Sequence, residues 1–139
     1  MVDTNVVLDD ILNRAPNADI ARRISRLVTD GIVNGHITAN CLTDIFYIVS
    51  KYRNDGTARK VIRNLLLAFS VVGVDDGDCR AAIDLPVRGF EDALVVIRAE
   101  KADLSYIVTN DKGFQGIADS SVSVISPSDF LLKFVCENC

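Results

Sequence analysis

Acidic side chains follow two apolar segments that are typical of β-strands. Asp3 comes directly after Val2, and Asp111 comes three residues after Val108. In open α/β sheets, ligands bind beyond the carboxyl ends of the strands, so acids on neighbouring strands converge on one cleft. Each aspartate alone also has an ordinary explanation, because Asp is a common turn or helix-cap residue.

Asp92 lacks such an explanation. In the helix expected over residues 90–102, Asp92 shares its face with the apolar side chains of Val96 and Ala99 at 100° per residue. Glu91 falls on the polar face, where acids are common. An ionised acid on a buried helix face is costly unless it is paired or lies beside a cation. We therefore interpret Asp92 as a functional residue.

Several carboxylates in one cleft need a cation or a proton. Two of them about 4 Å apart repel by about 4 kcal/mol at an effective dielectric of about 20. Asp44 is a further candidate near the start of a helix, although its i+7 neighbour Lys51 is compatible with a solvated face. His36 is the one histidine and is expected in a loop, so the donors are oxygens, which suit Mg²⁺ or Mn²⁺ better than zinc. Such ions activate water in phosphoester cleavage.

Four segments, in order along the chain, resemble the PIN domain family, and specifically the bacterial PIN-type toxins similar to VapC. No single segment is specific, but four in the same order are, and they span nearly the whole chain. They are Val2–Asp9, Leu42–Ile48, Phe90–Leu94 and Ile107–Phe114. The resemblance implies a Rossmann-like parallel sheet, a Mg²⁺- or Mn²⁺-dependent endoribonuclease that uses metal-activated water, a cognate antitoxin protein and often a homodimer.

Carried over by position, the resemblance implies an acidic quartet that holds the metal and supports catalysis: Asp3, Asp44, Asp92 and Asp111. It implies supporting roles for Glu91, as an outer acid near the metal, and for Thr4, Asn5, Thr109 and Asn110, as groups that orient water or ligands. Two departures stand out. Many relatives have Glu where Asp44 stands, and only two residues precede Asp3, so the first strand is short or its start is trimmed.

The elements that must position these residues alternate between short apolar runs and longer helical runs. This pattern predicts an α/β fold: one domain over residues 1–139, with a central parallel sheet of about five strands flanked by helices. Strands are expected near Val2 and over 37–39, 71–74, 104–108 and 122–125, and the main helices over 6–14, 20–28, 42–49, 58–66 and 90–102. A turn is expected at 54–56, and Ser126, Pro127 and Asp129 are a helix-start signature.

The net charge of −4 argues against a general nucleic-acid coat protein, but not against an enzyme that approaches RNA through bound cations. RNA would need local basic groups. Weak candidates are Arg22, Arg26, Lys51 and Arg53, although solvated helix faces explain them as well. Tyr47 and Tyr52 could stack on bases, although packing in the core or at an interface is their more ordinary role. Asp9, Asp10, Asp75, Asp76 and Asp78 are interpreted as surface or capping acids.

Other features bound the class of protein. The longest mostly apolar run, residues 65–74, is too short to cross a bilayer, and the N-terminus shows no secretory signal. We expect a cytoplasmic protein with no membrane partner and no organic cofactor. The four cysteines are at irregular spacings and are expected to be reduced and without function.

Two other classes of function remain open. A receiver-like phosphoacceptor domain also has acids at strand ends, with Asp75 as the acceptor. Such domains need a lysine just after the last strand, where Ser126 and Pro127 stand here. The other class is a catalytically inactive PIN-like module that binds RNA or protein, and the intact quartet argues against it.

Overall fold

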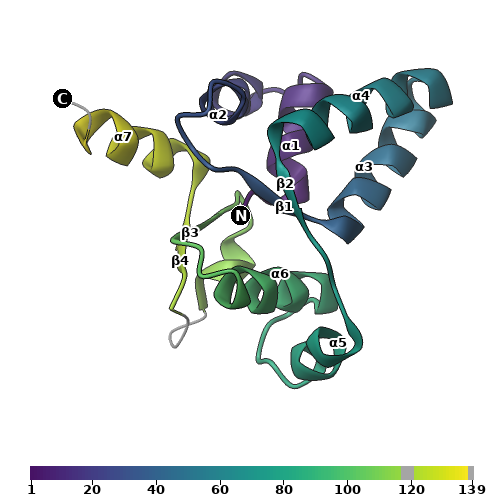
Figure 1. The fold of residues 1–139 in the computed structure, drawn as a ribbon. Helices are drawn as coiled ribbons and strands as arrows, with labels where there is room; N and C mark the ends of the chain where they lie inside the picture. The colour runs from purple at the N-terminus through teal and green to yellow at the C-terminus, as the bar shows by residue number, and fades with distance from the viewer. Residues whose placement is uncertain (117–120, 138–139) are drawn as a thin grey trace.

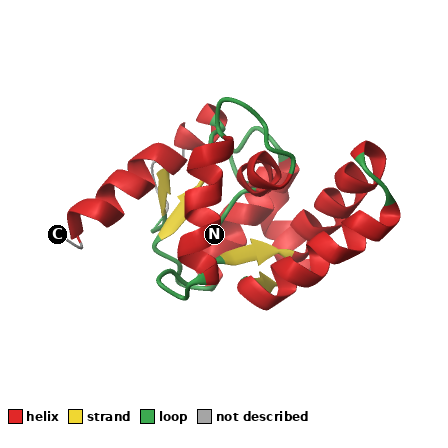
Figure 2. Ribbon diagram, turned by 90° about the horizontal axis from the view of Figure 1, so that it is seen from above, coloured by secondary structure: helices red, strands yellow, loops and turns green. Residues whose placement is uncertain are grey.

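Helices surround short parallel strands in the computed structural model, which describes residues 1–116 and 121–137 (Figures 1 and 2). No helix within those ranges is long and apolar enough to cross a membrane. The helices are α1 (Thr4–Ile11), α2 (Ala18–Thr29), α3 (Ala39–Tyr52), α4 (Asp55–Ala68), α5 (Asp76–Ile83), α6 (Phe90–Lys101) and α7 (Pro127–Glu137), with a 3₁₀ turn at Lys112–Gly116.

The strands form two parallel pairs. The strand β1 (His36–Thr38) pairs with β2 (Ser70–Val72), and β3 (Tyr106–Val108) pairs with β4 (Ser123–Ile125). Each strand is only three residues long. Parallel strands need long crossover connections, and here helices supply them.

The N-terminal segment joins the two pairs. Val2 forms a parallel bridge with Val108, and the Asp3 N–H donates to the Val108 carbonyl at 3.0 Å. On its other side, the Val2 N–H donates to the carbonyl of His36 at 2.9 Å. The order across the molecule is therefore β2, β1, N-terminal segment, β3, β4. The strand order reverses between this segment and β3, which is the position where α/β folds bind ligands.

Two hydrophobic cores lie on opposite sides of the strands. Val2 and Val108 pack with α1 to α4 and α7, whereas Met1 and Ile107 pack with α6. Successive residues of a strand point to opposite faces, so this alternation is what a sheet covered on both sides requires. The predicted α/β class is confirmed. Four strands and one bridged segment occupy the place of the five predicted strands in the described chain.

Several element boundaries differ from the predictions. The turn expected at 54–56 is instead a helix start: the side chain of Asn54 accepts a bond from the Thr57 N–H at 2.8 Å, and α4 begins at Asp55. Asn is a favoured cap residue, and this role competes with its preference for turns. His36 begins β1 rather than lying in a loop. The predicted start of α7 is confirmed, because Ser126 accepts a bond from the Asp129 N–H at 3.1 Å.

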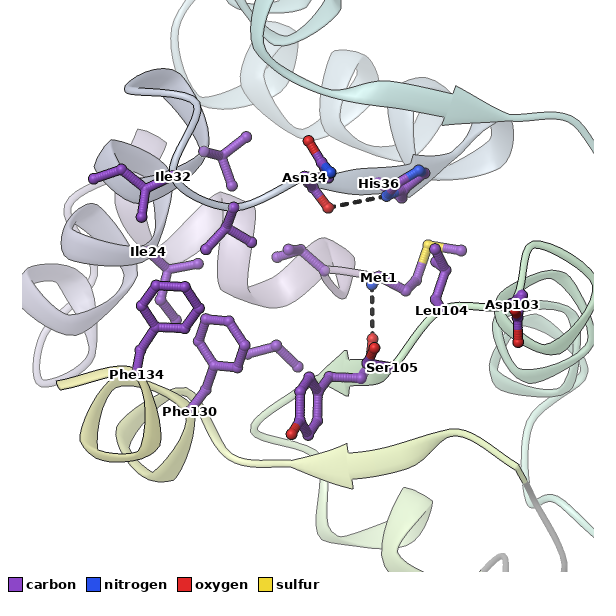
Figure 3. A pocket seen from close by; sticks show the side chains of 16 residues that line it. Met1, Ile24, Ile32, Asn34, His36, Asp103, Leu104, Ser105, Phe130 and Phe134 are labelled. Atoms are coloured by element: carbon purple, nitrogen blue, oxygen red, sulfur yellow. Dashed lines mark hydrogen bonds between the residues drawn. The ribbon is translucent and has the colours of Figure 1, made fainter. Parts of the chain in front are cut away.

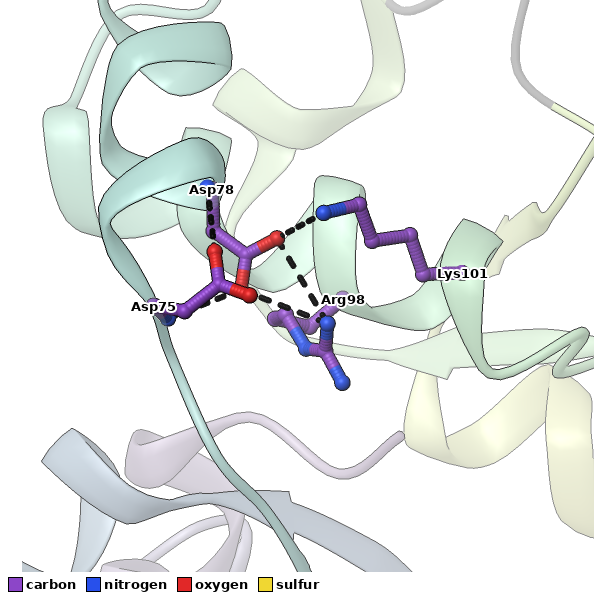
Figure 4. A network of polar contacts seen from close by, with 4 residues as sticks. All are labelled: Asp75, Asp78, Arg98 and Lys101. Atoms are coloured by element: carbon purple, nitrogen blue, oxygen red, sulfur yellow. Dashed lines mark hydrogen bonds and ion pairs between the residues drawn. The ribbon is translucent and has the colours of Figure 1, made fainter.

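Asp78 corrects the expectation of a surface acid, because its side chain is fully buried. It forms a capping box with Asp75 at the start of α5, so the capping part of the prediction is confirmed. The carboxylate also pairs with Lys101 and, at 3.3 Å, with Arg98, both on α6 (Figure 4). The hydrogen bond from Lys101, with that from the Asp75 N–H and the charge of Arg98, lowers the pKa of Asp78 to about 2.

Asp9 is also buried rather than on the surface. It lies on α1 and faces the segment after β3, where the Asn110 side-chain amide donates to its carboxylate at 3.4 Å. Arg14 lies 3.8 Å from its other oxygen. The sequence around Asp9 did not indicate this burial, because the covering residue Asn110 comes from a segment about a hundred positions away.

Candidate active site

One pocket gathers all four aspartates of the predicted quartet. It has a volume of about 330 Å³ and opens at the carboxyl ends of the N-terminal segment and β3. Glu91, Thr4 and Asn5, which were predicted to support the quartet, lie in its wall as well. The described lining is Asp3, Thr4, Asn5, Leu8, Asp44, Tyr47, Ile48, Glu91, Asp92 and Asp111.

Asp3 is the most enclosed acid of the pocket, with 8% of its surface exposed. It occupies the N-cap position of α1, but its side chain makes no capping bond there, so the ordinary explanation of a helix cap does not hold. Its carboxylate instead accepts a hydrogen bond from the Thr109 hydroxyl at 2.7 Å. Burial raises the pKa of Asp3 despite this bond, and the charge of Asp111 adds to the rise.

Thr109 links the two acids that follow strands. Its hydroxyl oxygen also accepts a bond from the Asp111 N–H at 3.0 Å. Asp111 is exposed, and the Gly113 N–H donates to its carboxylate at 2.8 Å, which orients the side chain at the start of the 3₁₀ turn. A buried threonine therefore sets the relative position of Asp3 and Asp111.

Asp92 and Glu91 lie in the first turn of α6. Partial burial, with the charges of Asp3 and Asp111, raises the pKa of Asp92 to about 6. Burial raises the pKa of Glu91 to about 7, together with a hydrogen bond to Asp44 and the charges of its acidic neighbours. The helical wheel assigned Glu91 to an outer polar face, and the pocket reaches that face because Asp44 is brought against it from α3.

Helix α3 forms one wall of the pocket. Cys41, Ile45 and Val49 are buried in the core, whereas Asp44 lies on a different face and lines the pocket. Burial raises the pKa of the Cys41 thiol to about 12. Cys41 is absent from the described lining of the pocket, where the charged donors are all carboxylate oxygens.

Tyr47 also lines this wall, and it is 67% exposed. Packing of Tyr47 and Tyr52 in the core is wrong, since Tyr52 is 65% exposed as well, whereas packing at an interface stays a prediction. The signal for Tyr47 was present in the sequence, because a residue three positions after Asp44 lies on the same face of a helix.

Two groups of predicted residues lie elsewhere. Asn110 is absent from the described lining, and its amide contacts Asp9 instead. Arg22 is held on α2 by acids, with its guanidinium 3.1 Å from Asp19 and 3.6 Å from Asp10. Arg26 is on α2 as well, whereas Lys51 and Arg53 are at the end of α3, the helix that carries Asp44.

The donor set fits a hard divalent cation. Five carboxylates share the pocket, and the raised pKa values of Asp3, Asp92 and Glu91 show that it resists full negative charge. Among the described residues, no three acidic, His or Cys side chains are already arranged as a metal site. Mg²⁺ and Mn²⁺ prefer such oxygen ligands.

A second cavity, of about 390 Å³, lies at the opposite ends of the strands (Figure 3). It is larger, but apolar side chains such as Ile24, Phe130 and Phe134 form much of its lining. The Met1 nitrogen donates to the Tyr106 carbonyl at 2.7 Å within it. Because it contains no cluster of acids among the described residues, the chemistry points to the smaller pocket.

Comparisons with known proteins agree with this geometry. Residues 1–113 match the family model described as the PIN domain. The fold is similar to a VapBC2 structure from Rickettsia felis bound to a DNA fragment from its promoter, with a TM-score of 0.68, 17% identity, and coverage of 91% of this chain and 96% of that one. It is also similar to a toxin–antitoxin complex from Klebsiella pneumoniae, with a TM-score of 0.66, 18% identity, and coverage of 91% and 95%. No curated protein matches the chain.

Proposed function

The chain belongs to the PIN domain family, and from this we propose that it is a Mg²⁺- or Mn²⁺-dependent endoribonuclease, the toxin of a toxin–antitoxin pair. The observation that carries the proposal is the single pocket that collects Asp3, Asp44, Asp92 and Asp111 from four separate parts of the chain. The reaction is hydrolysis of an RNA phosphodiester. A water oxygen bonds to phosphorus and gives up a proton, the bond to the leaving ribose oxygen breaks, and that oxygen takes a proton.

The acids of the pocket have distinct parts in this proposal. Asp3, Asp92 and Asp111 would hold the cation, and Asp44 would complete its surroundings. The ion, when bound, supplies positive charge against the scissile phosphate and makes a water molecule more acidic. Thr109 holds Asp3 in place through its hydroxyl.

Glu91 is suited to hold and exchange a proton near neutral pH. Its pKa of about 7 leaves it partly protonated near neutral pH, and it shares a hydrogen bond with Asp44. A group with a pKa near the working pH is an efficient proton carrier. In the proposed reaction, a carboxyl oxygen of Glu91 accepts and releases a proton at the edge of the pocket.

The partner we propose is an antitoxin protein, because one of the similar structures is described as a toxin–antitoxin complex and the other as VapBC2 bound to promoter DNA. The chain has exposed apolar side chains that a partner could cover, among them Leu66 and Leu67 on α4, at 52% and 88% exposure. A homodimer and a cytoplasmic location belong to the same proposal.

A thermal melt in MnCl₂ or MgCl₂ tests the cation site without knowledge of the RNA. At 100 times its Kd, a ligand that binds only the folded state stabilises it by about 2.7 kcal/mol. We expect the unmodified protein to melt at higher temperature with the metal, and Asp3→Asn and Asp92→Asn to show little shift. Cleavage of total RNA by the unmodified protein, absent in both variants, completes the test.

The opposite results would remove the proposal. If millimolar metal shifts no melt and RNA stays intact, an inactive module that binds RNA or protein takes its place. The receiver-like alternative is weakened already, because the side chain of Asp75 accepts the Asp78 N–H at 2.8 Å and serves as a helix cap.

A further inference from the structure

The pocket has an aromatic wall next to its acids. Tyr47 is the one aromatic side chain among the described residues that line it, and 67% of its surface is exposed. Exposing a ring to this extent gives up the stabilisation that burial of a large apolar side chain provides. The position of the ring therefore has no explanation in the packing of α3.

The ring is carried by a firmly packed helix. Ile45 and Val49, on the opposite side of α3, are fully buried in the main core. Asp44 and Tyr47 line the pocket one turn apart, and Lys51 follows one turn further on the same helix face, outside the described lining. A strand of RNA running along this face would meet first the acids, then the ring, then the ammonium group.

Resting on the ribonuclease function proposed above, we propose that Tyr47 stacks on an unpaired nucleobase next to the scissile phosphodiester. Every base has a face that can stack on an aromatic ring. In a duplex, the neighbouring pairs cover both faces of each base, so a paired base cannot present one. Lys51, one turn further along α3, contacts a backbone phosphate of the same strand.

Tyr52 provides a matched control on the same helix. It is equally exposed, at 65%, but lies about 140° around the helix from Tyr47 and is outside the described lining of the pocket. The third tyrosine, Tyr106, packs against Phe130 at a ring distance of 5.8 Å, at the other end of the strands. The full chain contains no tryptophan, so tyrosine dominates its fluorescence.

The test is a titration of the full chain with a mixed-sequence single-stranded RNA of eight nucleotides, in CaCl₂, followed by tyrosine fluorescence and by the anisotropy of labelled RNA. A second probe is a ribose-phosphate strand of the same length without bases. We compare the unmodified protein with Tyr47→Phe, Tyr47→Leu and Tyr52→Leu, after their melting temperatures show that all are folded.

We expect RNA to quench the tyrosine emission of the unmodified protein and of Tyr52→Leu, and to quench Tyr47→Phe much less. Tyr47→Phe keeps a ring and retains the affinity. Tyr47→Leu should bind RNA about 5- to 150-fold more weakly, which is the usual effect of losing one stacked base. The strand without bases should bind all four proteins equally weakly.

Two results would overturn the inference while leaving the ribonuclease intact. One is that Tyr47→Leu binds RNA as tightly as the unmodified protein, which still cleaves it in MgCl₂. The other is that Tyr47→Leu loses the same factor for both probes, because the ring would then contact the backbone or support the fold. If the unmodified protein neither binds nor cleaves any RNA, the proposed function fails, and the inference fails with it.

Discussion

Two clusters of acids in this molecule have opposite electrostatics. At the junction of α5 and α6, Asp78 is fully buried, yet its pKa is lowered to about 2 because Lys101, the Asp75 N–H and Arg98 surround it. In the acid pocket, the pKa values of Asp3, Asp92 and Glu91 are all raised. Burial raises the pKa of the acids in both clusters, so the opposite direction at Asp78 comes from the cations beside it.

The comparison separates a structural acid from a functional one. Asp78 has its own counter-charges within the chain, and its site is complete without a ligand. The pocket acids neighbour one another, so their repulsion is relieved by protons or, as we propose, by a bound cation. Groups with strongly raised or lowered pKa values occur in both kinds of site, and the identity of their partners distinguishes them.

The largest expected effect is on catalysis. Asp92→Asn removes a charge that the pocket needs for its cation, so RNA cleavage should fall by at least about 100-fold. The same change relieves repulsion with Asp3 and Asp111, so the metal-free protein should melt at a higher temperature. A cleavage assay and a melt on the same sample check both. Unaltered cleavage would remove Asp92 from the catalytic group.

The complementary change at the other cluster should affect stability and not catalysis directly. Asp78→Asn leaves Lys101 and Arg98 without their buried counter-charge, so the urea midpoint of unfolding should fall clearly. Asp76→Asn is the control, because Asp76 forms only an exposed pair with Arg80, which is worth about 0.2–1 kcal/mol. Equal midpoints for the two variants would contradict the assignment of Asp78 as a structural acid.

The two clusters should also respond to pH with opposite signs. For Asp92 and Glu91, the folded pKa values of about 6 and 7 exceed the ordinary values, so their contribution is fully present below about pH 4 and is lost as pH rises to about 7. For Asp78, the contribution is present above about pH 4 and is lost as pH falls towards 2.

Melting temperatures of the metal-free protein between pH 2 and pH 8 check this prediction. Asp92→Asn should flatten the loss of stability between pH 4 and pH 7, and Asp78→Asn should flatten the loss at acid pH. Saturating MgCl₂ should also flatten the loss of stability between pH 4 and pH 7, because a bound cation takes the place of the protons on the pocket acids. If the melting temperature falls in the same way with pH in all samples, the predicted opposite pH dependences of the two clusters are contradicted.

The smallest expected effect concerns basic residues that are paired or lie beside the pocket. Lys51 lies one helical turn beyond Tyr47 on the same face of α3, so Lys51→Ala should lower the slope of log affinity for RNA against log salt by about 1. Arg22 is already paired with Asp10 and Asp19, so Arg22→Ala should leave that slope unchanged. Salt titrations of labelled RNA binding measure both slopes. Equal changes in slope for the two variants would show that the ion pairs of Arg22 within the chain do not keep it from binding RNA.

Much of the fold followed from local patterns in the sequence. The helical period over residues 90–102 predicted α6 and the inward direction of Asp92, and Ser126 and Pro127 predicted the start of α7. The position of Asp3 and Asp111 after apolar runs predicted that they would meet, and they do, through Thr109. These features depend on residues that are close together in the chain.

Other features could not be predicted, because they depend on contacts between distant segments. Asp9 and Asp78 looked like surface or capping acids, and only Asn110, Arg98 and Lys101 explain their burial. The spacing of Tyr47 from Asp44 indicated a shared helix face, but the exposure of the ring became clear only once α3 was placed against the pocket.

The sequence by itself determined which residues could be catalytic, where most helices lie and that the fold is α/β, because periodicity and capping act over a few residues. Only the tertiary structure decided which acids have cations beside them and which have other acids. Those electrostatic partners come from segments about 20 to 100 positions apart, and an ionisable group takes its pKa from whatever the fold places within a few ångströms.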